Sequence, residues 1–343
     1  MIIINFFRDL ILYIKYKFKE NGFEIGFFCE NNYILNYLDP YIRKKINKKK
    51  LILIISFEEI FNEFNDKVVV YTFKTNFFRE LLFLTLKLKY LYSSTPDINN
   101  TIFKKTKFSN CKYIYIQHSP VSLNLIYRES AFDNFDAIQT ISKFQNNEIN
   151  EIIKTRNLKL KVFKSKYRFI EKNINTINKS KKIDLLIAPS WNTGFYKLNC
   201  HKILHQHLVK NFINYKLRPH PMSFKKNEIT IDEINNLEIK LDRSELINLN
   251  HFDFLISDWS GIFIEFALIN KRKSFLINTP KKEGNKTYEK YINKPIEITK
   301  RELFGKVFDV ENLDNLIEEL IKQKKDIKSK DHELIKFIDE NFY

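Results

Sequence analysis

The chain has 343 residues, which is too long for one ordinary hydrophobic core and fits two domains of typical size. Hydrophobic residues make up 44% of it, which excludes an intrinsically disordered chain. The formal net charge is +17, and two interpretations stay open: an anionic partner, or lysines spread over solvated faces. Since no nucleic-acid motif or basic–aromatic cluster is present, no nucleic-acid partner is predicted.

The first 14 residues are apolar, but Arg8 and Asp9 interrupt the run. A bilayer span needs about 20 apolar residues, and a signal peptide carries its charges ahead of its apolar stretch. Lys15, Lys17 and Lys19 follow, so an amphipathic helix lying in a membrane interface is one interpretation. An ordinary first helix packed on its domain is the other, and it is favoured.

The continuous apolar runs along the chain are typical of strands buried on both faces of a parallel sheet. Helical patterning at 261–269 and 313–322 favours repeated βαβ units, and the polar stretch 173–182 is predicted to be a linker. The fold class is therefore α/β, with two Rossmann-like domains at 1–175 and 176–343. The predicted strands are residues 24–29, 51–56, 68–73, 113–117, 137–141, 184–188, 215–217, 238–241, 254–257 and 274–277.

Cysteine and histidine usage gives little sign of metal binding. The three cysteines lie far apart and form no CxxC pair, so a reducing compartment and a cytoplasmic location are predicted. His201, His205 and His207 lie close together, and His201 and His205 could share one face of a helix, but a metal site would need a third ligand in reach. We therefore expect a solvated helix face there rather than a metal site.

Ligands of open α/β sheets bind at the carboxyl ends of the strands, so residues that follow strands carry the functional predictions. His118 ends the predicted strand 113–117 and precedes Pro120. A histidine at this place faces the cleft and titrates near neutral pH, as a general base must. A histidine that only makes a loop hydrogen bond is the alternative.

The segment Leu-Arg-Pro-His-Pro at 217–221 follows another predicted strand. Its two prolines fix the backbone and present Arg218 and His220 in a defined direction. A guanidinium is a planar fork that suits phosphate, and a neighbouring imidazole adds a donor. A rigid turn with incidental charges is the alternative, and a phosphate-binding role is favoured.

Residues 253–267 read as a strand, a polar turn and a helix. Asp258 or Ser260 is a suitable N-cap, and Gly261, one of only six glycines, would let a ligand approach the backbone. The free N–H groups of a helix N-terminus bind phosphate. Ser257 belongs to the same predicted donor site, and Glu265 lies about one turn further along, within reach of ribose hydroxyls. A plain capped helix is the alternative.

A weaker element, Ala-Pro-Ser-Trp at 188–191, follows the first strand of the second half. Its Ser190 and Trp191 are predicted to line the cleft on the donor side, although Trp191 is equally compatible with burial against the sheet. No glycine-rich P-loop or carboxylate cluster for Mg²⁺ is present, so no cofactor is predicted and dependence on a divalent metal stays open.

With these residues in place, the chain resembles the CDP-glycerol glycerophosphotransferase family, whose members build or prime teichoic-acid-like poly(glycerol phosphate) chains. The match runs in order from about residue 113 to residue 307, and the first hundred residues match only loosely. The matching segments are QHSPVS, IYRESAFDNFDAI, APSW, LRPHPMSF, ISDWSGIFIEFA and the stretch 275–298.

The resemblance implies a GT-B-like fold and transfer of a phosphoglycerol or related unit from a CDP-linked donor to an acceptor hydroxyl, with release of CMP. His118 would match the family's candidate base, His220 its second-domain histidine, and Ser260 with Gly261 its phosphate-binding turn. The family tends to read His-Gly where this chain has His118-Ser119, and Asp-Tyr-Ser-Ser at residues 258–261. A divergent branch is therefore expected.

The resemblance also implies partners: a lipid-linked glycan or polyol-phosphate acceptor, and an anionic membrane surface to which the protein binds peripherally at its inner face. Two other functions stay open. A GT-B glycosyltransferase that uses a nucleotide sugar would need the same cleft and helix terminus. A non-catalytic assembly factor would keep the fold, although the intact His118 and His220 oppose that interpretation.

Overall fold

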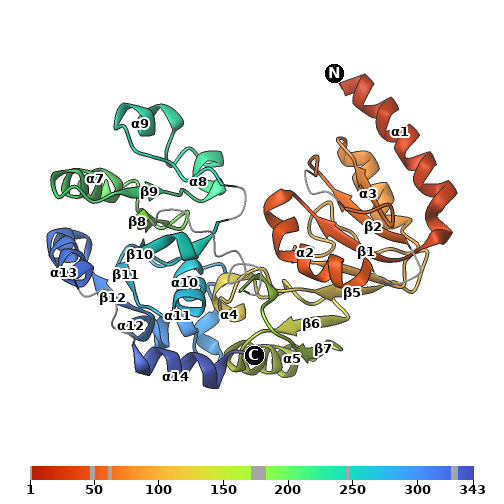
Figure 1. Ribbon diagram of the computed structural model, residues 1–343. Coiled ribbons are helices and arrows are strands. Elements are labelled where there is room, and N and C mark those ends of the chain that lie inside the picture. The colour runs from red at the N-terminus through yellow and green to blue at the C-terminus, as the bar shows by residue number, and fades with distance from the viewer. Residues whose placement is uncertain (1, 47–50, 61–63, 171–182, 245–246, 326–330) are drawn as a thin grey trace.

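The structure, a computed structural model, describes residues 2–46, 51–60, 64–170, 183–244, 247–325 and 331–343. Within these residues two parallel β-sheets are flanked by helices (Figure 1). The predicted α/β class is confirmed. The linker predicted at 173–182 lies in the part that the structure does not describe, and so does the boundary between residues 175 and 176.

The first sheet has seven strands in the order β3-β2-β1-β4-β5-β6-β7, all parallel. Its strands are β1 Phe23–Cys29, β2 Leu51–Ser56, β3 Val68–Thr72, β4 Tyr90–Ser93, β5 Lys112–Tyr115, β6 Ala137–Thr140 and β7 Lys161–Lys164. Its helices are α1 Ile2–Lys19, α2 Asn32–Ile46, α3 Asn76–Leu84, α4 Leu123–Ile126 and α5 Lys143–Arg156, with a 3-10 turn at Glu20–Gly22.

The second sheet has five parallel strands in the order β12-β11-β10-β8-β9, so the strand order reverses between β8 and β10. Its strands are β8 Ile183–Ile187, β9 Tyr215–Leu217, β10 Phe252–Ser257, β11 Ser274–Ile277 and β12 Gly305–Phe308. Its helices are α7 Cys200–Lys210, α8 Pro221–Lys225, α9 Ile231–Asn236, α10 Ile262–Asn270, α11 Ile296–Thr299, α12 Arg301–Phe304, α13 Leu313–Lys325 and α14 His332–Asn341. Short 3-10 turns lie at Leu249–His251, Tyr288–Lys290 and Val310–Asn312.

All but one of the predicted strands are present. The exception is 238–241, where Leu241 makes only an isolated bridge to Leu217 and Glu238 has a left-handed φ of 54°. A residue with positive φ cannot continue a strand, so the prediction fails there. Three short strands were not predicted: β4, β7 and β12. They have four residues each and carry polar or charged side chains, so their apolar signal is weak.

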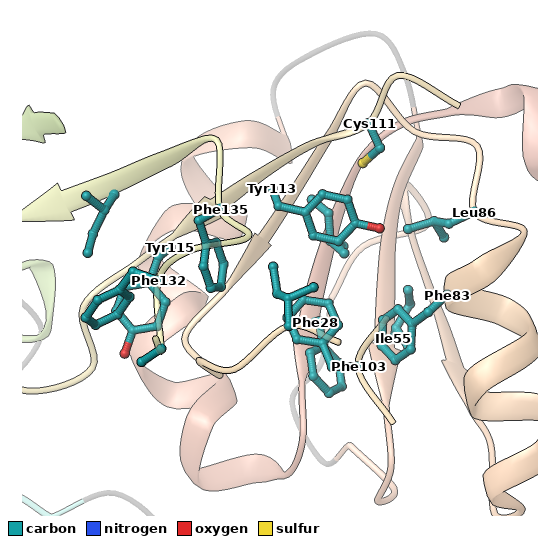
Figure 2. Packing of buried hydrophobic residues seen from close by; sticks show 14 of the residues in the cluster. Phe28, Ile55, Phe83, Leu86, Phe103, Cys111, Tyr113, Tyr115, Phe132 and Phe135 are labelled. Carbon is teal, nitrogen blue, oxygen red and sulfur yellow. The ribbon is translucent and has the colours of Figure 1, made fainter. Parts of the chain in front are cut away.

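Each sheet is buried on both faces, as its continuous apolar strands predicted. Figure 2 shows the aromatic cluster on one face of the first sheet, in which Phe28, Phe83 and Phe103 meet below Tyr113. Helices α1, α3 and α5 cover this face, and α2 covers the other. In the second sheet α7, α9 and α13 cover one face, and α10, α12 and α14 the other.

The two domains are joined by a strap, residues 279–297, which leaves the second domain and docks on α4 and α5 of the first. The N–H groups of Gly284 and Asn285 donate to the Leu125 carbonyl, at 2.9 and 3.0 Å. Further along, the Glu297 carboxylate accepts the backbone N–H of Ser122 at 2.8 Å and also contacts its hydroxyl. The strap therefore fixes one side of the space between the domains.

The C-terminal residues also return to the first domain. Phe342 bridges Ser142 in antiparallel fashion, and the N–H of Tyr343 donates to the Ile141 carbonyl at 3.0 Å. Figure 1 shows the C-terminus beside α5. The last residues of the chain thus help to hold the two domains together.

Candidate functional site

A cavity of about 420 Å³ lies between the two domains. It is lined by segments that follow β1 and β5 in the first sheet and β8, β9 and β10 in the second. These are carboxyl ends of parallel strands, and β8 and β10 are the strands between which the order reverses. This is where open α/β sheets bind their ligands.

Seven of the ten predicted site residues line this cavity: His118, Ser190, Arg218, His220, Ser260, Gly261 and Glu265. The fold therefore gathers residues that lie up to 147 positions apart in the sequence. Trp191, Ser257 and Asp258 do not line it. Each of them instead contacts a residue or loop that does.

Asp258 and Ser257 are fully buried beneath the cavity. The Asp258 carboxylate accepts the N–H of Ser190 at 2.7 Å and the hydroxyl of Thr193 at 2.6 Å. The Ser257 hydroxyl donates to the Ala188 carbonyl at 2.7 Å. Both side chains connect the loop after β8 to the turn after β10. Their positions therefore indicate that they support the site and do not contact a ligand.

The helix start at α10 differs from the predicted cap. The N-cap is Gly261, which has no side chain to accept a bond, and Asp258 is held by the loop after β8. The N–H groups of Ser260 and Gly261 have no partner in the described part of the chain. Unsatisfied donors at a helix N-terminus, together with the helix dipole, favour an anion.

His118 lines the cavity on the first-domain side. Its Nδ1 is 3.3 Å from the Tyr115 hydroxyl, and its carbonyl accepts the Tyr167 hydroxyl at 3.0 Å. Burial lowers the pKa of His118 to about 4, a contact with the Ser94 backbone opposes the shift, and the positive charge of Lys282 adds to it. The imidazole is therefore neutral near pH 7 and able to accept a proton.

His220 acts as a helix cap as well as a wall of the cavity. Its Nδ1 accepts the N–H of Met222 at 3.1 Å at the start of α8, where Pro221 fixes the backbone. Burial, Lys282 and His118 lower the pKa of His220 to about 3. Since Nδ1 is an acceptor, the neutral ring carries its proton on Nε2, and this tautomer makes it a hydrogen-bond donor.

Arg218 lines the cavity, but part of its guanidinium is already bound. Its Nη1 donates to the Asp242 carboxylate at 2.7 Å and to the Ser244 carbonyl at 2.8 Å. Such a pair orients the planar fork and leaves its other nitrogens for a ligand.

Glu265 is a buried carboxyl that faces the same cavity. Burial raises its pKa to about 8, while the hydrogen bond from the Tyr167 hydroxyl, 2.6 Å long, and the charge of Arg218 act in the opposite direction. At neutral pH the carboxyl is therefore protonated and able both to donate and to accept hydrogen bonds, as recognition of a sugar hydroxyl requires.

Lys282, on the strap, is a cavity residue that the sequence did not indicate. It is half-buried, its ammonium lies 5.1 Å from the centre of the Trp191 ring, and it makes no hydrogen bond or ion pair with a described residue. Burial lowers its pKa to about 8, and the carboxylates of Asp258, Glu228 and Glu297 oppose that shift. No local pattern distinguishes Lys282 from neighbouring lysines, because the docking of the strap alone places it.

Trp259 is a second residue that the predictions omitted, and it holds the α10 turn in place. Its Nε1 donates to the Thr279 carbonyl at 2.8 Å, and the Arg301 guanidinium stacks 3.9 Å from its ring centre. Arg301 also donates to the Asp258 carbonyl at 2.9 Å. An indole N–H directed at the strap gives a structural reason for tryptophan in the Asp-Trp-Ser-Gly sequence.

The solvated helix face predicted for the α7 histidines is wrong for His201, and His205 is half-buried. His201 is buried, and its Nε2 lies 3.1 Å from the Glu233 carboxylate, while His205 contacts the Tyr215 hydroxyl at 2.6 Å. Both pack against neighbouring elements of the second domain. In the described ranges, no three His, Cys, Asp or Glu side chains gather in a way that could hold a metal ion.

The two facing Rossmann-like domains, with the cleft between them at the strand ends, define a GT-B-like protein. Solved structures of the wall teichoic acid polymerase TagF share this fold: one covers 98% of this chain and 93% of its own length, with a TM-score of 0.58 and 14% identity. A histidine variant of TagF soaked with CDPG gives a TM-score of 0.52 at 12% identity, over 94% and 98% of the two chains. No family model and no curated protein sequence matches the chain.

The first prediction concerns Glu265. The folded-state pKa of about 8 lies above the usual 4.5, so the folded state loses stability as pH rises from about 4.5 through 8. Glu265→Gln keeps the Tyr167 contact but carries no charge. We expect it to be more stable than the wild type by a few kcal/mol at pH 9, with little difference at pH 4.5, because one pKa unit corresponds to about 1.4 kcal/mol.

The measurement is thermal and urea unfolding from pH 4.5 to pH 9. Glu318→Gln, at an exposed position of α13, is the matched control and should follow the wild type at every pH. A Glu265→Gln protein whose stability runs parallel to the wild type across this range would show that the Glu265 carboxyl ionises normally.

Proposed function

We propose that the protein is a transferase that moves a glycerol-phosphate or related polyol-phosphate unit from a CDP-linked donor to an acceptor hydroxyl, releasing CMP. One observation carries this proposal. A single cavity brings a neutral histidine from the first domain, His118, opposite the anion-binding groups of the second. The fold shared with the TagF structures supports the arrangement, and the CDPG soak of one of them concerns that protein alone.

The second domain supplies the groups for the donor's diphosphate. Arg218 and Lys282 carry positive charge, His220 offers its Nε2–H, and the start of α10 offers two free N–H groups. Charged donors hold phosphate more strongly than neutral ones do, and they act in a partly water-excluded space. Glu265, one turn into α10, is placed to hydrogen-bond ribose hydroxyls.

The chemical step in this proposal is an in-line displacement at the donor's β-phosphorus. The acceptor hydroxyl gives its proton to the His118 imidazole as its oxygen forms the new bond to phosphorus. The bond between the β-phosphorus and the bridging oxygen breaks, and CMP leaves with that electron pair. Arg218, His220 and the α10 N–H groups bind the charge that develops, so positioning and electrostatics supply most of the rate gain.

The low pKa of His118 is compatible with its role as the base in this step. Burial and Lys282 disfavour the imidazolium, whereas the negative charge of a bound diphosphate favours it. Donor binding therefore makes His118 a stronger base at the moment when one is needed. A glycosyltransferase acting on a nucleotide sugar would use the same cavity, and the two functions differ in the nucleotide that they release.

The second prediction separates these functions. We expect release of CMP from CDP-glycerol or CDP-ribitol in the presence of acceptor, with no UDP from UDP-sugars, when the products are resolved by chromatography. UDP release alone would favour the glycosyltransferase. Failure of every nucleotide to raise the melting temperature would favour a non-catalytic assembly factor.

Within the same assay, His118→Ala should reduce turnover by at least about a hundredfold, the lower end of what a general base contributes. Donor affinity measured by calorimetry should stay within a few-fold of the wild type, because His118 acts on the acceptor and the charged groups proposed to hold the diphosphate, Arg218 and Lys282, remain. Turnover near the wild-type rate in His118→Ala would show that another group accepts the proton.

The third prediction concerns Lys282. Its ammonium should hold the diphosphate only while protonated, so the affinity for CDP should fall as pH rises through about 8. Lys282→Met should weaken CDP binding by about tenfold to a hundredfold at pH 7, as expected for a lost charged hydrogen bond. Lys282→Arg should retain most of the affinity and lose the decline near pH 8, since arginine stays charged.

The control is Lys281→Met. Lys281 is the preceding residue, but it contacts Tyr288 and Glu283 and does not line the cavity. Calorimetric titrations with CDP from pH 6.5 to pH 9.5 provide the affinities. Equal losses in Lys281→Met and Lys282→Met would mean that net charge, rather than a contact at the cavity, determines binding.

We also propose that α1 binds an anionic membrane, where a lipid-linked acceptor would lie. One face of α1 is packed on the domain: Tyr16 is buried, and the Asp9 carboxylate accepts the N–H groups of Lys74 and Thr75 at 2.9 and 2.7 Å. The other face exposes an apolar stripe at helical spacing. Its members are Ile3, Ile4, Phe7, Ile11, Ile14 and Phe18.

The stripe combines four isoleucines with two phenylalanines, and Phe18 is 87% exposed. Figure 1 shows α1 on the outer side of the first domain, away from the second. Lys15 and Lys19 are exposed beside the stripe, which favours anionic lipid as the occupant, because each basic residue near such a surface contributes about 1 kcal/mol. None of the described helices, α1 included, is long and apolar enough to cross a bilayer.

The fourth prediction follows from this surface. The double variant Phe7→Asp/Phe18→Asp should lose co-sedimentation with phosphatidylglycerol vesicles at low salt while keeping CDP affinity. Phe212→Asp, which changes a phenylalanine 94% exposed on the second domain, should bind vesicles like the wild type. Wild-type protein that stays in the supernatant, or forms dimers through this stripe, would contradict the membrane proposal.

A further inference from the structure

Position 261 has no room for a side chain because residues of the other domain lie against it. Its backbone conformation, by contrast, does not call for glycine. Its φ of −60° and ψ of −12° are helical values that any residue adopts. A methyl group added to it would overlap the Oγ of Ser119 and lie 2.5 Å from a methyl carbon of Val121. Both neighbours belong to the first domain. The space that a side chain at the α10 start would fill is therefore occupied from the opposite domain.

The group that fills this space is the hydroxyl of Ser119. The Oγ of Ser119 makes no hydrogen bond within the described ranges, and Ser119 lines the cavity. The surrounding backbone is fixed, because the buried Gln145 amide donates to the Ser119 and Val121 carbonyls at 3.3 and 2.9 Å. The hydroxyl is thus held over the α10 start without being used by the fold.

A second cavity residue points to the same ligand chemistry. Ser190 is 1% exposed, and its Oγ is buried without a hydrogen-bond partner in the described structure. Its N–H is fixed by Asp258, the residue that begins the α10 turn. An unsatisfied buried hydroxyl is costly unless something binds it. Two serines, one from each domain, therefore bring free hydroxyl groups to the cavity that contains the α10 start.

From this geometry we propose that the Ser119 hydroxyl is a ligand of the donor phosphate, supplied across the domain interface in place of a side chain at position 261. The inference rests on the proposed function, since it assigns a further residue to the same donor site. Ser119 donates to a phosphate oxygen that also accepts the N–H groups of Ser260 and Gly261. The two positions are coupled, because a side chain at 261 and the hydroxyl of Ser119 exclude each other.

This arrangement has a consequence for the order of binding and chemistry. Ser119 directly follows His118, so a phosphate held by Ser119 also fixes the backbone that carries the candidate base. Donor binding then aligns the first-domain loop with the second-domain helix. An enzyme that assembles its site from two domains gains from such a shared contact, since misplacement of about 1 Å slows a reaction substantially.

The fifth prediction tests the hydroxyl. Ser119→Ala should weaken binding of CDP and of the CDP-linked donor by about tenfold or more, as expected for a hydrogen bond to a charged group. It should leave binding of cytidine, which has no phosphate, unchanged. Ser130→Ala removes a half-buried serine of the same domain that does not line the cavity, and it should match the wild type with all three ligands.

A transfer of the hydroxyl tests the coupling. Gly261→Ser alone should lose CDP affinity because it clashes with Ser119 and Val121. In a Ser119→Gly/Val121→Ala background, Gly261→Ser should bind CDP about tenfold more tightly than Gly261→Ala in that background, since only the former restores a hydroxyl. Circular dichroism and melting curves establish that each variant is folded before its affinity is measured.

The outcomes distinguish the two proposals. Wild-type protein that binds no nucleoside diphosphate overturns the proposed function itself. Wild-type protein that binds CDP, with Ser119→Ala binding it equally well, overturns only the role of Ser119. An equal loss for cytidine and CDP in Ser119→Ala would likewise overturn the phosphate contact, because it would reflect a distorted cavity.

Discussion

The candidate site depends on a contact between backbones of the two domains. Gly284 lies so close to the end of α4 that an added methyl group would overlap the Ile126 carbonyl. Its N–H donates to the Leu125 carbonyl at 2.9 Å, so glycine is needed for the approach and the hydrogen bond directs it. Two residues earlier on the same strap is Lys282. The contact that joins the domains thereby also places a cation in the cavity.

Buried carboxyl groups reinforce the same junction. Glu148 on α5 accepts the N–H of Leu123 at 2.7 Å, and Glu297 on the strap accepts the N–H of Ser122 at 2.8 Å. Burial raises the pKa of both carboxyl groups, and the charge of Glu297 raises that of Glu148 further. Backbone donors offset part of the cost of burying these groups. Such pairs fix one geometry, which suits a junction that must align two halves of a site.

The sequence predicted those features of the fold and the site that depend on a local residue pattern. Buried strands have continuous apolar runs, and residues directly after them reach the strand ends, so His118, Arg218, His220 and Ser260 meet as expected. Lys282 has no such signal, because the docking of the strap decides its place. The role of Asp258 within its motif was also unpredictable: its carboxylate supports the loop after β8 by accepting the Ser190 N–H and the Thr193 hydroxyl.

The pKa shifts of the titratable groups in the cavity have a common cause. Burial lowers the pKa of His118, His220 and Lys282 and raises that of Glu265, so every shift favours the less charged form. Cationic groups brought together without an anion disfavour each other's charge, which is why Lys282 depresses both histidines. The negative charge of a diphosphate bound among them would oppose that repulsion and raise the pKa of all three groups. Bringing these groups together costs folding stability and favours an anionic ligand, and perturbed pKa values of this kind are common at functional sites.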